Sequence, residues 1–289
     1  MVDLHTHSTS SDGDLSPAEL IEEAVNRGLS AIALTDHDTI NGLTNARNEA
    51  ALRGIRFIPG IELEIRWNPP QGVAGLGPGG EFHLLGLGIT RPSPAFIDGI
   101  AELARRREER NREILDRMRE LGVEADYEEI RAFSGGHSVG RPHFASLLVR
   151  RKIVKNVEQA FARYLGAGKP FYVPKAGLDF ERAAALIRES GGIPVLAHPM
   201  SLYVAWGRLP DLIRSLRDRG LAGVEAWHPT ARVHACRRLE ELGKALGLYI
   251  TAGSDFHGAV RPDRRLGVTA GGRRIEDSVL EAIGALGYE

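Results

Sequence analysis

The chain has 289 residues, of which 43% are hydrophobic and 26% are charged, and its formal net charge is −1. This length can bury one large core, or one core with a modest appended domain, and it contains no apolar run near the roughly 20 residues of a membrane helix. The first residues lead directly into Asp3 and His5, so we expect a cytoplasmic protein that does not enter membranes. The single cysteine, Cys236, excludes an internal disulfide framework and a thiolate metal cage.

Short apolar runs alternate with amphipathic segments along most of the chain, which indicates βα units and favours a parallel barrel. In the first predicted helix, Ser16 is the cap, Pro17 takes the first position and Glu19 completes a capping box before Gly28 ends the helix. Further helices are predicted at residues 180–189, 209–219 and 231–246. Seven strands are predicted, at residues 2–4, 31–35, 56–61, 81–87, 193–197, 223–227 and 249–254.

The alternation stops between about Arg91 and Lys175, where helical periodicity replaces the strand pattern. We interpret residues 93–174 as an inserted helical subdomain between two parts of a barrel, residues 1–92 and 175–289. On one helix of this insertion, Arg107 and Asn111 interrupt an apolar face, either because they contact something polar or because the register shifts at the surface. The Gly-rich stretch 72–80 is interpreted as a connection and not as a phosphate loop, since no Gly-Lys-Ser/Thr follows it.

The insertion carries a local excess of positive charge. Residues 135–178 contain eight basic residues against Glu158 alone, a net charge of +7, so the rest of the chain carries −8. Such a patch suits a phosphate-bearing partner, although a solvated helical face is the alternative for any single residue. Arg141 offers a planar fork that matches phosphate, and Lys169 and Lys175 offer point charges.

Side chains that can bind metals lie on or just after nearly every predicted strand. His5 and His7 end the first strand, where residues two apart face the same side and can bind one ion together. The other candidates are Asp12, His37, Glu62, His83, His198, His228, Asp255 and His257. A lone histidine is usually a structural residue. Because the carboxyl ends of barrel strands form the active-site face, however, the joint pattern predicts one metal site.

Several motifs resemble the polymerase and histidinol phosphatase (PHP) superfamily of metal-dependent phosphoesterases. They are residues 3–8 (Asp-Leu-His-Thr-His-Ser), 11–13, 34–38, 60–62, 197–199 and 253–257. Residues 140–143, which include Arg141 and His143, and residues 168–174 resemble insertion motifs of the stand-alone branch. That branch contains nucleoside 3′,5′-bisphosphate phosphatases and 5′-end oligonucleotide exonucleases. The resemblance spans almost the whole chain.

This resemblance implies a distorted (β/α)7 TIM-like barrel with two to three divalent ions, in agreement with the seven predicted strands. It assigns the first ion to His5, His7, Glu62 and Asp255, the second to Glu62, His83 and His198, and the third to Asp12, His37 and His257. Glu62 would bridge the first two ions. Imidazole and carboxylate ligands suit Mn, Fe or Zn, and their spacing does not select among these metals.

Clustered ions can lower the pKa of bound water to produce hydroxide and can neutralise charge on a phosphoryl group. We therefore predict metal-dependent hydrolysis of phosphate esters, with Asp255 and His257 in the catalytic cluster. His228 is a candidate general acid for the leaving group or a substrate ligand. Substrate binding is assigned to Arg141, His143, Lys169, Lys175 and His228. The expected substrate is a nucleotide or a short oligonucleotide, and no obligate protein partner is expected.

Other classes stay open. An amidohydrolase-type barrel also begins with His-x-His and would hydrolyse amides or cyclic ureas. It has no use for the set of Asp12, His37 and His257. A non-enzymatic module, like the PHP domains inside bacterial replicative polymerases, fits less well because the ligand set is complete and 289 residues leave no room for a polymerase. A small substrate similar to histidinol phosphate is a further alternative.

Overall fold

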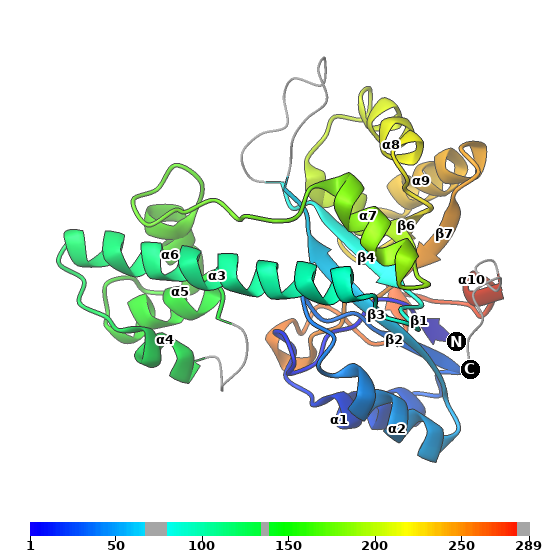
Figure 1. The fold of residues 1–289 in the computed structure, drawn as a ribbon, viewed down its shortest axis with the longest axis horizontal. Helices are drawn as coiled ribbons and strands as arrows, with labels where there is room; N and C mark the ends of the chain where they lie inside the picture. Colours follow the sequence, from blue (N-terminus) through cyan, green and yellow to red (C-terminus); the bar gives the residue numbers. More distant parts are fainter. Residues whose placement is uncertain (67–79, 134–138, 282–289) are drawn as a thin grey trace. The chain divides into compact units, whose positions relative to one another are not determined.

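A nearly closed sheet of seven strands forms the barrel part of the chain. The computed structural model describes residues 1–66, 80–133 and 139–281. The strands follow chain order (Figure 1): β1 (Val2–Asp3), β2 (Ala31–Leu34), β3 (Arg56–Glu64), β4 (His83–Leu87), β5 (Ile193–Leu196), β6 (Gly223–Trp227) and β7 (Tyr249–Ala252). Thr6 forms a parallel bridge with Phe256, and the Leu4 amide donates to the Ala252 carbonyl at 3.4 Å, so the first and last strands meet. The predicted seven-stranded α/β barrel is confirmed.

One strand runs against the predicted direction. β4 pairs antiparallel with both β3 and β5, so the prediction of an entirely parallel barrel was wrong for this strand. A parallel β3–β4 pair would need a crossover, usually a helix, and the Gly-rich stretch 72–80 carries no helical pattern. That stretch lies outside the described residues except for Gly80. Because β4 is reversed, its first residue, His83, pairs with Glu64 at the end of β3.

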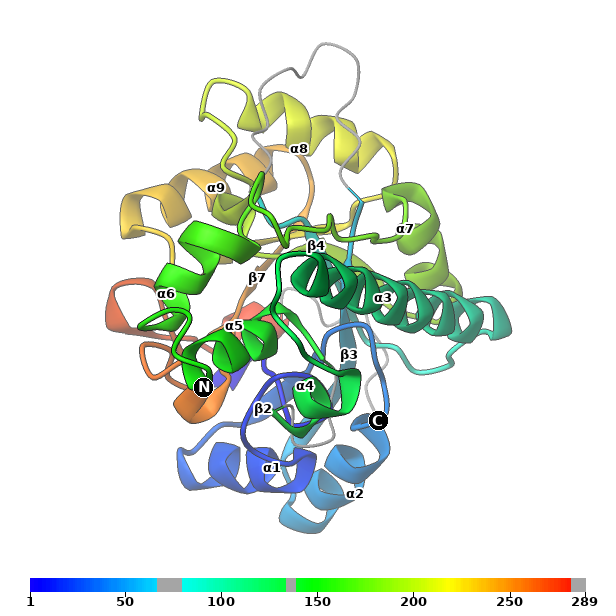
Figure 2. The same cartoon turned by 90° about the vertical axis from the view of Figure 1, so that its left-hand side faces the viewer.

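The first two helices cover one side of the barrel. α1 (Pro17–Asn26) and α2 (Leu43–Arg53) lie side by side in both views (Figures 1 and 2). The predicted capping box of α1 is present, with Ser16 Oγ accepting from the Glu19 amide at 3.3 Å and the Ser16 amide donating to Glu19 Oε2 at 2.8 Å. α2 was not predicted, because its apolar pattern is weak and its cap, Gly42, has no side chain that could cap it.

Alternate residues of β2 pack on opposite faces of the sheet. Ala31 and Ala33 belong to the apolar cluster inside the barrel, whereas Ile32 and Leu34 pack with the residues of α1 and α2. This alternation follows from the two-residue period of a strand. On this strand the small side chains therefore face the barrel interior and the large ones face the helices.

The second half of the barrel contains the other predicted helices. α7 (Phe180–Glu189), α8 (Leu209–Asp218) and α9 (Val233–Ala245) agree with the predicted ranges within a few residues. Gly243 lets α9 approach the sheet closely, because a Cβ there would lie 2.5 Å from Ile250 Cδ1. The remaining short elements of this half are η2 (Pro199–Leu202), η3 (Gly258–Val260), β8 (Val268–Thr269), η4 (Ala270–Gly272), β9 (Arg273–Arg274) and α10 (Ser278–Glu281).

The chain divides into two compact units, Met1–Ile100 with Gly177–Glu289, and Ala101–Ala176. The second unit contains most of α3 (Pro94–Glu120), with α4 (Tyr127–Phe133), α5 (Arg141–Arg150), α6 (Val157–Ala160) and η1 (Phe161–Leu165). The predicted insertion, residues 93–174, begins at the start of α3, and this helix contributes residues to both units.

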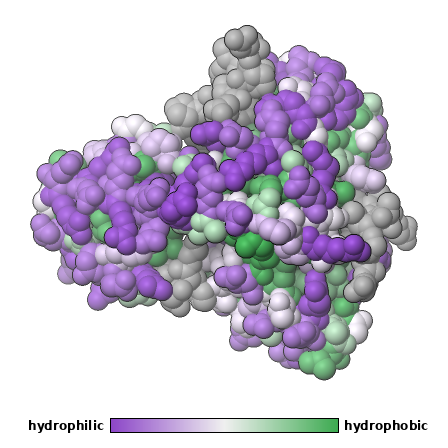
Figure 3. All heavy atoms as spheres, viewed as in Figure 1, coloured by the Kyte–Doolittle hydropathy of each residue, from purple (hydrophilic) through white to green (hydrophobic). Residues whose placement is uncertain are grey.

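The Ala101–Ala176 unit has its own apolar core, which includes Ile114, Met118 and Phe144. Asn111 is buried in this unit, and its Nδ2 donates to the Val139 carbonyl at 2.9 Å, so its interruption of the apolar face reflects a polar contact. The exposed side of α3 is hydrophilic in Figure 3. Among the described helices, none combines the length and apolar character needed to cross a membrane.

Candidate metal centre

The structure brings all nine predicted metal ligands together at one end of the barrel. They are His5, His7, Asp12, His37, Glu62, His83, His198, Asp255 and His257, and every one of them has a ring nitrogen or carboxylate oxygen within 4 Å of another. The reversal of β4 matters here, because it places His83 at the edge where the neighbouring strands end. Ligands that follow different strands, far apart in the sequence, therefore lie close together in space.

Glu62 lies in the middle of the cluster, and its two oxygens face different histidines. Oε1 lies 2.9 Å from His83 Nδ1 and 2.8 Å from His198 Nε2. Oε2 lies 3.3 Å from Nε2 of both His5 and His7. A carboxylate that directs one oxygen to each of two histidine pairs has the arrangement needed to bridge two ions.

His5, His7 and Asp255 form one set that can hold an ion. The Nε2 atoms of His5 and His7 are 3.1 Å apart, and Asp255 Oδ1 lies 3.5 Å and 3.2 Å from them. Two imidazole nitrogens whose lone pairs face each other repel unless a proton or a metal cation lies between them. Neighbouring acceptors of this kind therefore fit a divalent ion.

A second set contains His7, Asp12, His37 and His257. Asp12 Oδ1 lies 3.3 Å from His257 Nε2, and Asp12 Oδ2 lies 3.9 Å from His37 Nε2. His7 Nδ1 is 3.8 Å from Asp12 Oδ1, so His7 presents one nitrogen to each set. The family resemblance did not assign His7 to this group. His37 also forms a third set with Glu62 and His83.

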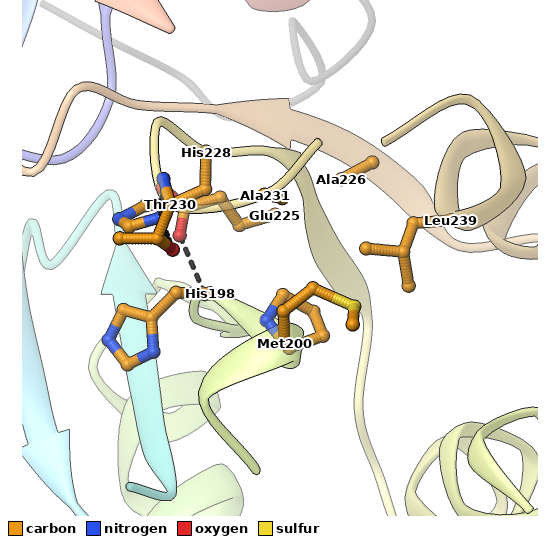
Figure 4. A pocket seen from close by; sticks show the side chains of 9 residues that line it. His198, Met200, Glu225, Ala226, His228, Thr230, Ala231 and Leu239 are labelled. Carbon is orange, nitrogen blue, oxygen red and sulfur yellow. Dashed lines mark hydrogen bonds between the residues drawn. The ribbon is translucent and has the colours of Figure 1, made fainter. Parts of the chain in front are cut away.

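Neighbouring polar residues determine which ring nitrogen of His5 and of His198 faces the cluster. Glu225, which was not predicted, places Oε1 3.0 Å from His5 Nδ1 and accepts a hydrogen bond at Oε2 from the His198 amide at 2.7 Å (Figure 4). Ser201 Oγ lies 2.6 Å from His198 Nδ1. These contacts leave Nε2 of His5 and His198 directed at Glu62, as is usual for histidines that bind metals.

Other buried polar residues around the cluster were also missed by the sequence analysis. Glu64 Oε2 lies 3.2 Å from His83 Nε2, and Asp36 accepts hydrogen bonds from Ser8 and Ser11. Asp36 precedes His37 in one of the motifs, and this position could have identified it as a residue of the site. Glu64 and Glu225 lie on strands, where an acidic residue facing the site cannot be told from one facing solvent by spacing alone.

Two of the candidate ligands have a strained backbone. His198 and Asp255 have φ angles of 28° and 52°, in the left-handed region that residues with a side chain rarely adopt. Each such residue costs about 1–3 kcal/mol and persists only where surrounding contacts hold it. His198 lies two residues after β5 and Asp255 lies three residues after β7, and both side chains reach the cluster.

His228 lies beside this cluster and lines a small pocket together with Met200, Ala226 and Leu239, among others (Figure 4). The Thr230 amide donates to His228 Nδ1 at 3.3 Å, so the ring proton belongs on Nε2, which lies 3.2 Å from Asp255 Oδ2. Burial lowers the pKa of His228 well below its usual value. A neutral imidazole at neutral pH favours a hydrogen-bonding role over that of an imidazolium acid.

Two ligand atoms of the cluster, although they lie near oppositely charged groups, form no hydrogen bond with good geometry. Glu62 Oε2 and His257 Nε2 are buried and form no hydrogen bond within the described part of the chain. Leaving such an atom unpaired costs about 1–3 kcal/mol. Nitrogen and carboxylate oxygen donors in these groupings fit divalent Mn, Fe or Zn.

The carboxylates of the cluster raise the pKa of two histidines. Although burial lowers the pKa of His5, the Glu225 and Glu62 carboxylates outweigh it and raise the value to about 10. Burial likewise opposes protonation of His83, and Glu62 with Glu64 raises its pKa to about 10. Both rings therefore carry protons at neutral pH when no metal ion is bound. Because the folded protein binds these two protons more tightly than the unfolded chain does, protonation stabilises the metal-free fold. This contribution is complete below about pH 6.5 and is lost as the pH rises through about 10.

Metal binding is expected to release about two protons at pH 7.5, because an ion must displace those on His5 and His83. The apparent metal affinity should therefore rise with pH between about 7 and 9. Titration calorimetry with Mn in buffers of different ionisation enthalpy, such as Tris and HEPES, measures the number of protons released. Equal heats in both buffers would contradict this expectation.

The predicted substrate-binding residues other than His228 belong to the Ala101–Ala176 unit. Arg141 is the first residue of α5, and its guanidinium lies over the rings of Tyr172 and Phe161, at 5.6 Å and 6.0 Å from their centroids. The Gly140 amide donates to His143 Nδ1 at 2.9 Å, which gives His143 a structural contact. Lys169 is exposed and Lys175 is half-buried.

Comparisons with known proteins show which family this chain belongs to. The sequence matches the PHP domain family over residues 3–173. It is 32% identical over 269 residues to a 3′,5′-nucleoside bisphosphate phosphatase of Chromobacterium violaceum, covering 93% of this chain and 91% of that protein. It is 34% identical over 255 residues to a 5′-3′ exoribonuclease of Haemophilus influenzae, covering 88% of this chain and 89% of that protein.

A solved structure gives the same fold. It is described as an amidohydrolase from Chromobacterium violaceum with bound sulfate and no metal, and it is 30% identical to this chain. The two superpose with a TM-score of 0.80 over 97% of this chain and 96% of the other.

Proposed function

This chain belongs to the PHP family and is a hydrolase of phosphate esters, and we propose that its substrates are phosphomonoesters of nucleotides. The resemblance found in its motifs is confirmed by the match over residues 3–173. The observation that carries the proposal is the convergence of nine residues with nitrogen and oxygen ligand atoms, among which Glu62 faces two pairs of histidines. The non-enzymatic alternative has no comparable support.

We assign two to three divalent ions to this cluster. His5, His7, Glu62 and Asp255 would hold the first, Glu62, His83 and His198 the second, and Asp12, His37 and His257 the third. His7 Nδ1, which faces Asp12, can add to the third set. When bound, such ions lower the pKa of water and neutralise charge on the phosphoryl oxygens.

The chain's own residues orient these ligands and the substrate. Glu225 holds His5 and the His198 backbone, so their Nε2 atoms keep one direction. His228, as a neutral imidazole, directs its Nε2 proton towards Asp255 Oδ2. When substrate binds, the same N–H can donate to a substrate oxygen instead of to Asp255. We therefore favour the substrate-ligand role of His228 over that of general acid.

The relatives point to the class of substrate. One is named for nucleoside 3′,5′-bisphosphates and another for 5′-3′ cleavage of RNA. Both names concern phosphate groups attached to nucleosides. The net charge of +7 on residues 135–178 suits such polyanions, and we propose that Arg141, Lys169 and Lys175 bind phosphate. A nucleoside 3′,5′-bisphosphate or a short 5′-phosphorylated oligonucleotide is the proposed substrate.

A substrate panel tests this proposal. Mn-loaded protein would be assayed with a nucleoside 3′,5′-bisphosphate, a 5′-phosphorylated dinucleotide, histidinol phosphate, an aryl phosphate and a cyclic urea. The highest kcat/KM is expected for one of the two nucleotides. A preference for histidinol phosphate would overturn the nucleotide assignment. Because one solved relative is described as an amidohydrolase, hydrolysis of the cyclic urea without phosphatase activity would favour that class instead.

Arg141→Ala is expected to raise KM for the bisphosphate and to leave kcat nearly unchanged. Its guanidinium is preorganised over Tyr172 and Phe161, and losing a charged hydrogen bond costs about 1.5–3 kcal/mol, or roughly 10- to 150-fold in kcat/KM. An aryl phosphate, which has no second phosphate, should be affected far less. Arg163→Ala is the matched control, because Arg163 is exposed and also stacks on a ring, that of Tyr164. Equal losses on both substrates would assign Arg141 to the reacting phosphate.

A further inference from the structure

A buried arginine contacts the candidate metal centre from outside any recognised motif. Arg264 follows η3, and only 7% of its surface is exposed. Its Nη1 contacts Asp255 Oδ2 and lies 3.5 Å from His228 Nε2. A guanidinium keeps its charge at all ordinary pH values, so this residue brings a permanent positive charge to the edge of the cluster.

The two oxygens of Asp255 have separate neighbours. Oδ1 faces Nε2 of His7 at 3.2 Å and of His5 at 3.5 Å, where an ion would bind. Oδ2 faces Arg264 and His228 instead. The arginine therefore does not compete for Oδ1, and its guanidinium contacts the carboxylate that would hold the first ion.

One donor of this guanidinium is left without a partner. Arg264 Nε is buried and has no hydrogen bond to any described residue. Asp263 Oδ2 lies 4.0 Å from this nitrogen, beyond hydrogen-bond distance, on a side chain that is 73% exposed. A buried charged donor is unfavourable unless it is hydrogen-bonded, so this N–H indicates a ligand that binds beside the cluster.

We propose that Arg264 binds an oxygen of the phosphoryl group that is hydrolysed, while Asp255 Oδ2 anchors the other side of the guanidinium. This proposal rests on the proposed phosphatase function. The planar guanidinium matches the oxygens of a phosphate, and its position beside the ion site suits the reacting phosphate and not a distant one. The ligand class is a phosphomonoester or the inorganic phosphate product.

The test compares Arg264→Gln and Arg264→Lys with Arg265→Gln, a control at the exposed neighbouring residue. Metal content is measured by elemental analysis, the affinity of the Mn-loaded full chain for inorganic phosphate by calorimetry, and kcat/KM with both a nucleoside bisphosphate and an aryl phosphate. Arg264→Gln should keep its metal and bind phosphate about 10- to 100-fold more weakly. Its kcat/KM should fall by a similar factor on both substrates. Arg264→Lys should lie between Arg264→Gln and the wild type.

Other outcomes would overturn the proposal. Wild-type phosphate affinity in Arg264→Gln would remove Arg264 from the site. Loss of metal, with full activity regained at high Mn, would make it only a positioning residue for Asp255. If neither variant folds, a crystal structure of wild-type protein with Mn and phosphate decides, because Arg264 Nε must lie about 3 Å from a phosphate oxygen. If wild-type protein binds phosphate through Arg264 but hydrolyses no phosphate ester of the substrate panel, the proposed function is wrong, whereas the phosphate-binding role of Arg264 is supported.

Discussion

Removal of bound metal by a chelator is expected to abolish phosphatase activity and to leave the barrel folded. The candidate ligands lie past the strand ends, whereas the apolar residues inside the barrel, such as Val2, Leu85 and Val195, form a separate core. The raised pKa of His5 and His83 lets protons replace part of the lost positive charge near neutral pH. Activity, circular dichroism and elemental analysis at pH 7 measure the effect.

Adding Mn back to the chelated protein should restore activity, which separates demetallation from irreversible unfolding. Full activity in protein that elemental analysis shows to be free of metal would contradict the metal-dependent mechanism. Complete unfolding on chelation would show that the ions also hold the barrel together. The pH should be kept below about 9, because the protons on His5 and His83 are lost as the pH rises towards 10.

Asp255→Asn is expected to lower kcat/KM by on the order of 10³-fold, or about 4 kcal/mol, and to reduce the metal content. The change keeps the size of the side chain and removes its charge. Oδ1 then binds an ion beside His5 and His7 less tightly, and Arg264 loses the carboxylate that pairs with its buried guanidinium. Steady-state kinetics and elemental analysis on the same preparation measure both effects.

Asp263→Asn is the matched control for this substitution, because it makes the same chemical change on an exposed side chain near the cluster. It should keep wild-type kinetics and metal content. Wild-type rates and a full metal complement in Asp255→Asn would remove Asp255 from the first ion. Thermal unfolding of both variants shows whether the loss comes from the site or from the fold.

The sequence by itself determined the positions of the seven strands and of most barrel helices. These features depend on neighbouring residues, as in α1, where Ser16, Pro17 and Glu19 form the start of the helix within four positions. The candidate ligands could also be named, because barrel topology brings successive strand ends to one face. His5 and His7 illustrate this, since their spacing alone places both rings on one side.

Only the tertiary structure decided the direction of β4 and the partners of each ligand. A reversed strand keeps the same local residues, so its direction depends on pairing with β3 and β5 and not on its own sequence. Arg264 meets His228 across 36 positions and stands in no motif, so its role follows from packing. Glu225 likewise joins His5 to His198 from a strand that is distant in sequence from His5. Contacts of this kind depend on how distant segments pack, and no periodicity in the chain encodes them.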